Sequence, residues 1–138
     1  MKKQALLIID HGSTRGDAND LLPRVAQMLK EISDLEIVCY AHMELAEPTI
    51  EQGFEACVTA GADEVVVHPY FLAPGRHSVS DIPRMVAQAA ARHAGVSYRI
   101  TDPLGLDPKI GQLILERVRQ AADQEQAAKH ALDRSPRR

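Results

Sequence analysis

The sequence has little of what marks a nucleic-acid-binding, disulfide-stabilised or membrane protein. It has 16 lysines and arginines against 19 aspartates and glutamates, so a formal charge of −3 leaves no basic footprint for nucleic acid. No apolar run approaches the roughly 20 residues that span a bilayer. Its two cysteines, Cys39 and Cys57, form no CxxC motif. They fit buried free thiols better than an iron–sulfur cluster or a structural zinc site.

The N-terminus resembles the start of a secretion signal only briefly. Two lysines precede an apolar run, but LLII stops at Asp10 and His11 and is too short for the apolar region of a signal peptide. We therefore predict a cytoplasmic protein whose first strand begins near Ala5. Its 138 residues, 45% of them hydrophobic, are enough to bury a core as one domain.

Four short apolar segments alternate with helical patterns along the chain. Residues 5–10, 36–42, 64–70 and 97–101 are predicted strands, and stripes of 3.6-residue period lie between and after them. Helices are expected to begin near Asn19 or Asp20, at Pro48, near Ser80 and at Pro108. This alternation predicts a three-layer α/β domain, flavodoxin-like, with a four-stranded parallel sheet and helices on both faces. The domain covers residues 1–120, and residues 121–138 form a polar tail, partly helical or disordered.

Three polar side chains follow the first three predicted strands. The carboxyl ends of parallel strands share one edge of a sheet, so His11, Glu44 and His77 are expected to converge there. Two imidazoles and a carboxylate suit Co²⁺, Fe²⁺, Ni²⁺ or Zn²⁺ better than Mg²⁺ or Ca²⁺. Each histidine is also a possible proton acceptor. The alternatives are a loop-capping role for His11, an exposed loop position for His77, and a role at the helix start for Glu44, although Glu47, next to Pro48, suits that role better.

Other residues near these strands have simpler interpretations. Gly12 would let the backbone approach a ligand closely. His42 belongs either to the second strand or to the rim of the pocket. His68 interrupts a buried strand and is predicted to be a core histidine with a satisfied hydrogen bond. His93, near the end of the third main helix, is expected to be a favourable terminal charge or a surface residue.

Four motifs carry a resemblance to a known family. LLIIDHGSTRGDAN, ELAEPTIEQG, VVVHPYFLAPGRHSVSDIP and the weaker DPLGLDPKI follow one another between about Ala5 and Gln120. In these motifs the chain resembles the short, CbiX-type sirohydrochlorin chelatases. The resemblance implies a chelatase-like fold, a homodimer, and insertion of a divalent metal into a sirohydrochlorin-type tetrapyrrole in cobalamin or siroheme biosynthesis. Co²⁺, with Fe²⁺ and Ni²⁺ as alternatives, is then a substrate, and no cofactor is permanently bound.

The resemblance also assigns roles to residues. His11, Glu44 and His77 become the metal ligands, and His11 and His77 the catalytic residues. The substrate of this family carries many carboxylates. Hydroxyl and guanidinium groups in the same loops are candidates to bind them: Ser13, Arg15, Arg76 and Ser78.

Asp10 departs from the family pattern, in which a small residue usually precedes this histidine. It either orients the His11 imidazole or forms a hydrogen-bonded strand end. It also argues against phosphoryl transfer, because a phosphatase histidine needs an arginine beside it. The remaining alternative function is a carrier that binds metal or tetrapyrrole without turnover. The sequence leaves open the physiological metal and the choice between sirohydrochlorin and precorrin-2.

Overall fold

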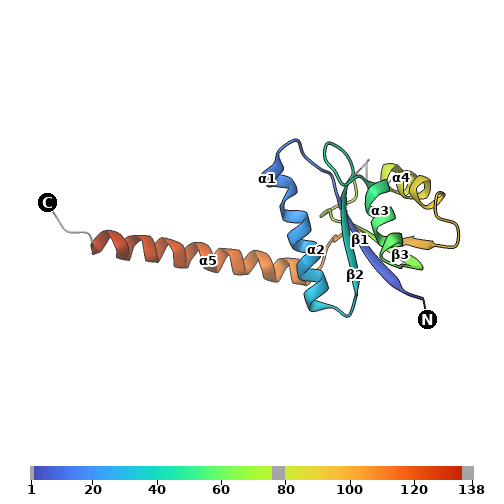
Figure 1. Cartoon of the computed structure of the whole chain (residues 1–138). Helices are drawn as coiled ribbons and strands as arrows, with labels where there is room; N and C mark the ends of the chain where they lie inside the picture. Colours follow the sequence, from blue (N-terminus) through green and yellow to red (C-terminus); the bar gives the residue numbers. More distant parts are fainter. Residues whose placement is uncertain (1, 76–79, 135–138) are drawn as a thin grey trace. The chain divides into compact units, whose positions relative to one another are not determined.

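Four parallel strands form the centre of residues 1–105 in the computed structural model, which describes residues 2–75 and 80–134 (Figure 1). They are β1 (Gln4–Asp10), β2 (Ile37–His42), β3 (Glu64–Pro69) and β4 (Ser97–Ile100), and they lie in the order β2-β1-β3-β4. All three pairings are parallel. The strands agree with the predicted segments, and their carboxyl ends share one edge.

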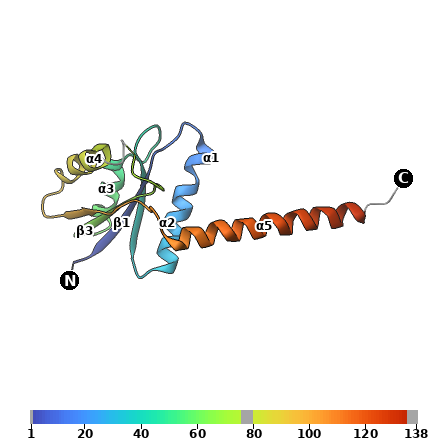
Figure 2. The same cartoon turned by 180° about the vertical axis from the view of Figure 1, so that it is seen from behind.

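Helices cover the two faces of this sheet. Helix α2 (Leu21–Ile32) packs on one face, and α3 (Ile50–Thr59) and α4 (Ile82–Ala90) pack on the other. Figures 1 and 2 show α2 and the α3–α4 pair on opposite sides of the strands. The predicted three-layer α/β architecture is confirmed.

The core explains why the central strand is a continuous aliphatic run. Leu7 and Ile9 of β1 point into the cluster under α3 and α4, together with Phe54, whereas Ile8 points into the cluster under α2. All four side chains are fully buried. A strand with helices on both sides has no polar face, and this is why LLII lacks alternation.

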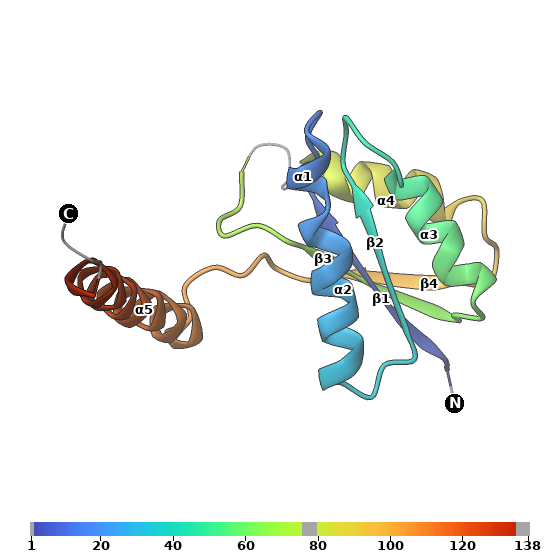
Figure 3. The ribbon, with the colours of Figure 1, turned by 60° about the vertical axis from the view of Figure 1, so that its left-hand side comes forward.

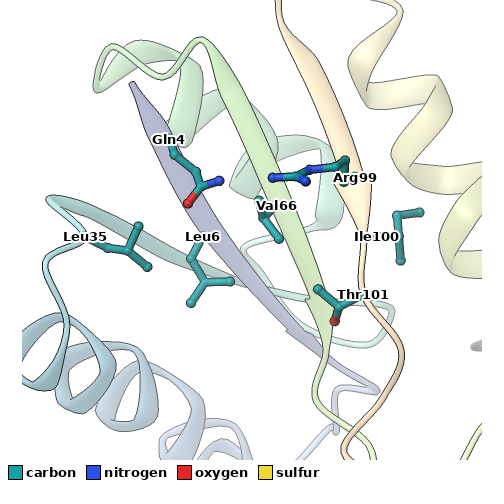
Figure 4. A pocket seen from close by; sticks show the side chains of 7 residues that line it. All are labelled: Gln4, Leu6, Leu35, Val66, Arg99, Ile100 and Thr101. Atoms are coloured by element: carbon teal, nitrogen blue, oxygen red, sulfur yellow. The ribbon is translucent and has the colours of Figure 1, made fainter. Parts of the chain in front are cut away.

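On the side of the sheet that α2 packs against, β1, β3 and β4 line a groove of about 430 Å³ (Figure 4). Arg99 is its one charged residue, and the Arg99 Nη2 lies 2.6 Å from Glu64 Oε1. This contact lowers the pKa of Glu64. The groove offers no histidine or carboxylate among its lining residues, which are Gln4, Leu6, Leu35, Val66, Arg99, Ile100 and Thr101. It is therefore not the predicted metal site.

Two local features differ from the sequence expectation. The chain forms a short helical turn, α1 (Gly16–Asn19), before the helix expected to begin near Asn19 or Asp20. Helix α3 begins after Thr49, not at Pro48, because Thr49 and Gln52 form a reciprocal capping box. Thr49 Oγ1 accepts from Gln52 N at 3.2 Å, and Gln52 Oε1 accepts from Thr49 N at 2.9 Å. These bonds satisfy two backbone donors that Pro48 could not have satisfied.

Residues 106–138 form a second unit, which consists of helix α5 (Pro108–Asp133) and its ends. As predicted, Asp107 caps the helix and Pro108 is its first residue; Asp107 Oδ1 accepts from Lys109 N at 2.8 Å. The helix continues past Ala121 because Ala, Gln, Glu and Lys are strong helix formers. The domain boundary at residue 120 stays a prediction. Among the helices of the described residues, α5 included, none combines the length and the apolarity that crossing a membrane requires.

Candidate metal site

His11 and Glu44 meet at the carboxyl edge of the sheet. His11 follows β1 and Glu44 follows the neighbouring β2, and His11 Nε2 lies 2.8 Å from Glu44 Oε1. Both side chains are about half exposed, at 46% and 50%. Figure 3 shows the loops that carry them side by side above the strands. Two of the three predicted ligands are therefore in contact, on a surface open to a ligand.

The two loops are joined through their backbones. Met43 N donates to Asp10 O at 2.8 Å, and Glu44 N donates to His11 O at 3.1 Å. Gly12 has φ +91°, and a Cβ at this residue would lie 1.9 Å from Glu44 O. The prediction for Gly12 was a close approach to a ligand; the close approach that the structure shows is to the Glu44 carbonyl.

The spacing of the two side chains suits shared coordination. Two ligand atoms about 2.1 Å from one ion are about 3.0 Å apart at a right angle and about 3.4 Å apart at a tetrahedral angle. The observed 2.8 Å requires at most a small opening of the pair. Within residues 2–75 and 80–134 no third His, Cys, Asp or Glu completes a metal-binding group. His77 lies outside the described residues and stays a prediction, as do Arg76 and Ser78.

Ser13 and Arg15 are engaged within the first loop. Asn19 fixes the loop on both sides, since its Oδ1 accepts from Ser13 N at 3.0 Å and its Nδ2 donates to Ser13 O at 2.7 Å. Ser13 Oγ accepts from Arg15 N, and the Arg15 guanidinium pairs with Asp17, both at 3.0 Å. An exposed ion pair of this kind contributes about 1 kcal/mol or less, so a carboxylated ligand can compete for Arg15. The binding role of both residues stays a prediction.

Asp10 bonds to His42. Asp10 Oδ1 lies 2.6 Å from His42 Nδ1, and His42 is buried. Of the two roles considered for Asp10, the hydrogen-bonded strand end agrees with this contact. His42, whose place the sequence did not decide, is the last residue of β2. Asp10 and His42 are the last residues of adjacent parallel strands, and the register of these strands places them opposite each other.

The remaining histidines have structural partners. His68 Nδ1 lies 2.7 Å from Thr101 Oγ1, in agreement with the predicted satisfied hydrogen bond, and burial lowers the pKa of His68. His68 is half-buried, however, and not deep in the core. The His93 ring stacks on Phe54 with centroids 5.7 Å apart, a packing contact that the sequence analysis missed.

The two cysteines are free, as predicted, although only Cys57 is fully buried. A hydrogen bond from Cys57 lowers the pKa of Cys39 to about 7, and the same bond with burial raises the pKa of Cys57. Cys39 therefore carries the more ionisable thiol of the pair.

The chain is thus a parallel α/β protein with a histidine–carboxylate pair at the carboxyl edge of its sheet. Residues 5–121 match the CbiX family, and the chain belongs to that family.

Named relatives and solved structures agree with this placement. The chain is 51% identical over 100 residues to the chloroplastic sirohydrochlorin ferrochelatase of Arabidopsis thaliana, covering 72% of this chain and 44% of that protein. It is 29% identical over 143 residues to the sirohydrochlorin cobaltochelatase of Methanopyrus kandleri, covering 88% and 99%. The crystal structure of the sirohydrochlorin chelatase SirB from Bacillus subtilis subspecies spizizenii with cobalt superimposes with a TM-score of 0.79 at 33% identity, covering 86% and 50%. The chain thus spans about half the length of some relatives and nearly all of another.

Proposed function

We propose that this chain is a sirohydrochlorin chelatase, a lyase-class enzyme that inserts a divalent metal ion into a sirohydrochlorin-type tetrapyrrole. The observation that carries this proposal is the 2.8 Å contact of His11 Nε2 with Glu44 Oε1 at an exposed sheet edge, in a member of the CbiX family. The names of the relatives, both ferrochelatases and cobaltochelatases, support it.

The chemistry requires a metal donor set and a proton acceptor together. Metal insertion replaces two pyrrole N–H protons by one divalent ion, so two protons must leave the macrocycle. In the proposed reaction His11 and Glu44 present the metal ion, with His77 as a third ligand. As the ion passes to the pyrrole nitrogens, His11 and His77 are released from it and are able to accept the protons.

The metal is a substrate in this proposal, and no cofactor is permanently bound. Imidazole and carboxylate ligands suit Co²⁺, Fe²⁺ and Ni²⁺ alike, and we propose Co²⁺ as the first candidate. Solved SirB structures contain cobalt or Fe³⁺, which supports both cobalt and iron as candidates. Insertion rates for the three ions, compared under anaerobic conditions, would rank them and indicate whether the product belongs to cobalamin or siroheme biosynthesis.

Substrate binding is proposed to use the loops around the metal. Ser13, Arg15, Arg76 and Ser78 are the candidates to bind the carboxylates of the macrocycle. Because His11 and Glu44 are about half exposed, one chain leaves one side of a flat macrocycle uncovered. We propose that a second copy covers that side in a homodimer, which light scattering would detect as twice the chain mass. The location in the cytoplasm stays a prediction.

The test mixes the chain with sirohydrochlorin and Co²⁺ and follows the absorption change. A rate above that of metal and tetrapyrrole alone is expected for the parent chain. A rate no higher than this control would reject the chelatase and favour a carrier.

Variants then test the site residues. His11→Ala and His77→Ala should each lower the insertion rate at least 100-fold, in line with the usual contribution of a positioned acid–base group. Little loss of folding is expected, because His11 follows the end of β1 and His77 is predicted to lie in a loop. Glu44→Gln should weaken Co²⁺ binding, whereas Glu47→Gln, three residues further on, is a matched control expected to bind normally. A variant that keeps the parent rate or affinity removes its residue from the proposed site.

A further inference from the structure

A buried side-chain pair closes the ends of β1 and β2 next to the candidate site. Asp10 and His42 are register partners at the last position of the paired strands. Asp10 Oδ1 lies 2.6 Å from His42 Nδ1, a short distance typical of a bond to a charged group. The His42 side chain is 2% exposed and that of Asp10 is 22% exposed, so water competes little for this bond.

The contacts between the two segments continue beyond this pair, past the end of the sheet, as far as His11 and Glu44. Beyond it, Met43 N donates to Asp10 O at 2.8 Å and Glu44 N donates to His11 O at 3.1 Å. The backbone of His42 is also fixed from the other side, since His42 N donates to Pro48 O at 2.8 Å. The two backbone bonds between the loops thus lie within two residues of the Asp10–His42 bond.

We propose that the Asp10–His42 bond positions the metal site. The register of β1 and β2 brings the two residues opposite each other. Their bond then holds the loops that follow these strands at one offset, and that offset determines whether His11 Nε2 and Glu44 Oε1 reach the same ion. Neither Asp10 nor His42 coordinates metal in this scheme; both act through their neighbours. The inference rests on the proposed function in so far as His11 and Glu44 bind the metal.

The tight packing of the loops explains why a small change in offset matters. A Cβ placed on Gly12 would lie 1.9 Å from Glu44 O and 3.1 Å from His42 Cβ, so the loops have no slack at this point. Ligand side chains need placement within about 0.5 Å to share an ion. Removal of outer partners that orient ligands typically costs about 10–100-fold in metal affinity.

The test measures Co²⁺ affinity by calorimetry on the full chain, with thermal unfolding of the metal-free chain recorded in parallel. Asp10→Ala should weaken Co²⁺ binding about tenfold or more, and Asp10→Asn, whose amide oxygen can accept the same bond, should stay within about threefold of the parent. The single variants Asp10→Ala and His42→Leu are compared with the double variant. The double variant should lose no more Co²⁺ affinity than the weaker binder of the two single variants, because the two residues act as one unit.

The matched control is a second side-chain contact of a strand histidine, the one between His68 and Thr101. His68 belongs to β3 and Thr101 follows β4, with His68 Nδ1 2.7 Å from Thr101 Oγ1. Neither residue belongs to the two loops that carry His11 and Glu44. Thr101→Val should leave Co²⁺ affinity unchanged even where it lowers the unfolding temperature. A fall in affinity for Thr101→Val equal to that for Asp10→Ala would reduce the effect to general stability and overturn the proposal.

Two further outcomes would overturn it. One is parent-like Co²⁺ affinity in Asp10→Ala, and the other is an Asp10→Asn variant as weak as Asp10→Ala. A parent chain that binds Co²⁺ but inserts none of Co²⁺, Fe²⁺ and Ni²⁺ into sirohydrochlorin rejects the chelatase and leaves the positioning role standing. A parent chain without measurable affinity for any of the three ions rejects both.

Discussion

At Gly12 the chain turns back so closely on the second loop that its α-carbon has no room for a side chain. Its φ of +91° is a conformation that residues with a Cβ rarely adopt, and the added carbon would meet the Glu44 carbonyl oxygen at 1.9 Å. The backbone strain and the steric clash both act on the loop that carries His11. Relief of either is expected to move His11 away from Glu44. A single methyl group therefore tests whether the contact of these loops is needed for metal binding.

Gly12→Ala is expected to destabilise the chain by about 2 kcal/mol or more, as backbone strain combined with a steric clash usually does. It should also weaken Co²⁺ binding at least tenfold, because the two ligands no longer converge. Urea unfolding and calorimetric titration measure the two effects. Gly16→Ala is the control, since a Cβ there meets nothing within 4 Å and φ is not positive. Parent-like Co²⁺ affinity in Gly12→Ala would contradict the proposed convergence.

At the scale of elements, α3 depends on its first turn. Thr49 and Gln52 satisfy each other's backbone donors, and the helix begins directly behind the loop that carries Glu44. Thr49→Ala should cost about 1 kcal/mol of unfolding free energy, and Thr49→Ser should restore most of it. The urea midpoint measures both changes. Thr59→Ala, at the exposed far end of the same helix, should change the midpoint little; an equal loss there would show that the cap is not the cause.

Elements with one dominant signal could be predicted from the sequence. The strands follow from short aliphatic runs, and the convergence of His11 with Glu44 follows from the parallel order alone, since both residues come directly after adjacent strands. Details for which two sequence signals compete could not be predicted, and the start of α3 is an example. Pro48 is a good first helical residue, but the Thr49 capping box satisfies more backbone donors and sets the start.

The Asp10–His42 bond is a second feature that could not be predicted from the sequence. It requires the register of β1 against β2, which is set by packing along the whole pair of strands and not by either segment. The sequence narrowed Asp10 to two roles, and only the register separates them. The same holds for His93, whose stacking on Phe54 joins the end of α4 to α3.

At the scale of the whole molecule, the two units can be followed separately. The chain has three tyrosines, Tyr40, Tyr70 and Tyr98, and no tryptophan, and all three tyrosines lie in residues 1–105. Tyrosine fluorescence therefore reports the unfolding of the sheet domain, whereas far-ultraviolet circular dichroism also contains the signal of α5. Unfolding free energies for the site-bearing unit should come from fluorescence, because two units need not unfold together.

The pH dependence of that unfolding free energy has a contribution of known sign from His68. Burial lowers the pKa of His68 below its ordinary value of 6.5. Between the lowered pKa and pH 6.5 the unfolded chain binds the proton and the folded chain does not, so stability rises with pH in this window. Above pH 6.5 the contribution is complete, and it is lost as the pH falls through the lowered pKa. Glu64, whose pKa Arg99 lowers, acts in a separate window below about 4.5.

His68→Gln should therefore flatten the fall in stability between pH 6.5 and 5. Glutamine does not titrate, and its side-chain amide is able to bond Thr101 as the imidazole does. Urea unfolding followed by tyrosine fluorescence at several pH values gives the difference between parent and variant, in which the titration of the other histidines cancels. His130→Gln, on the exposed surface of α5, is the control and should reproduce the parent profile. Parallel pH profiles for the parent and His68→Gln would mean that burial of this imidazole does not penalise its charged form.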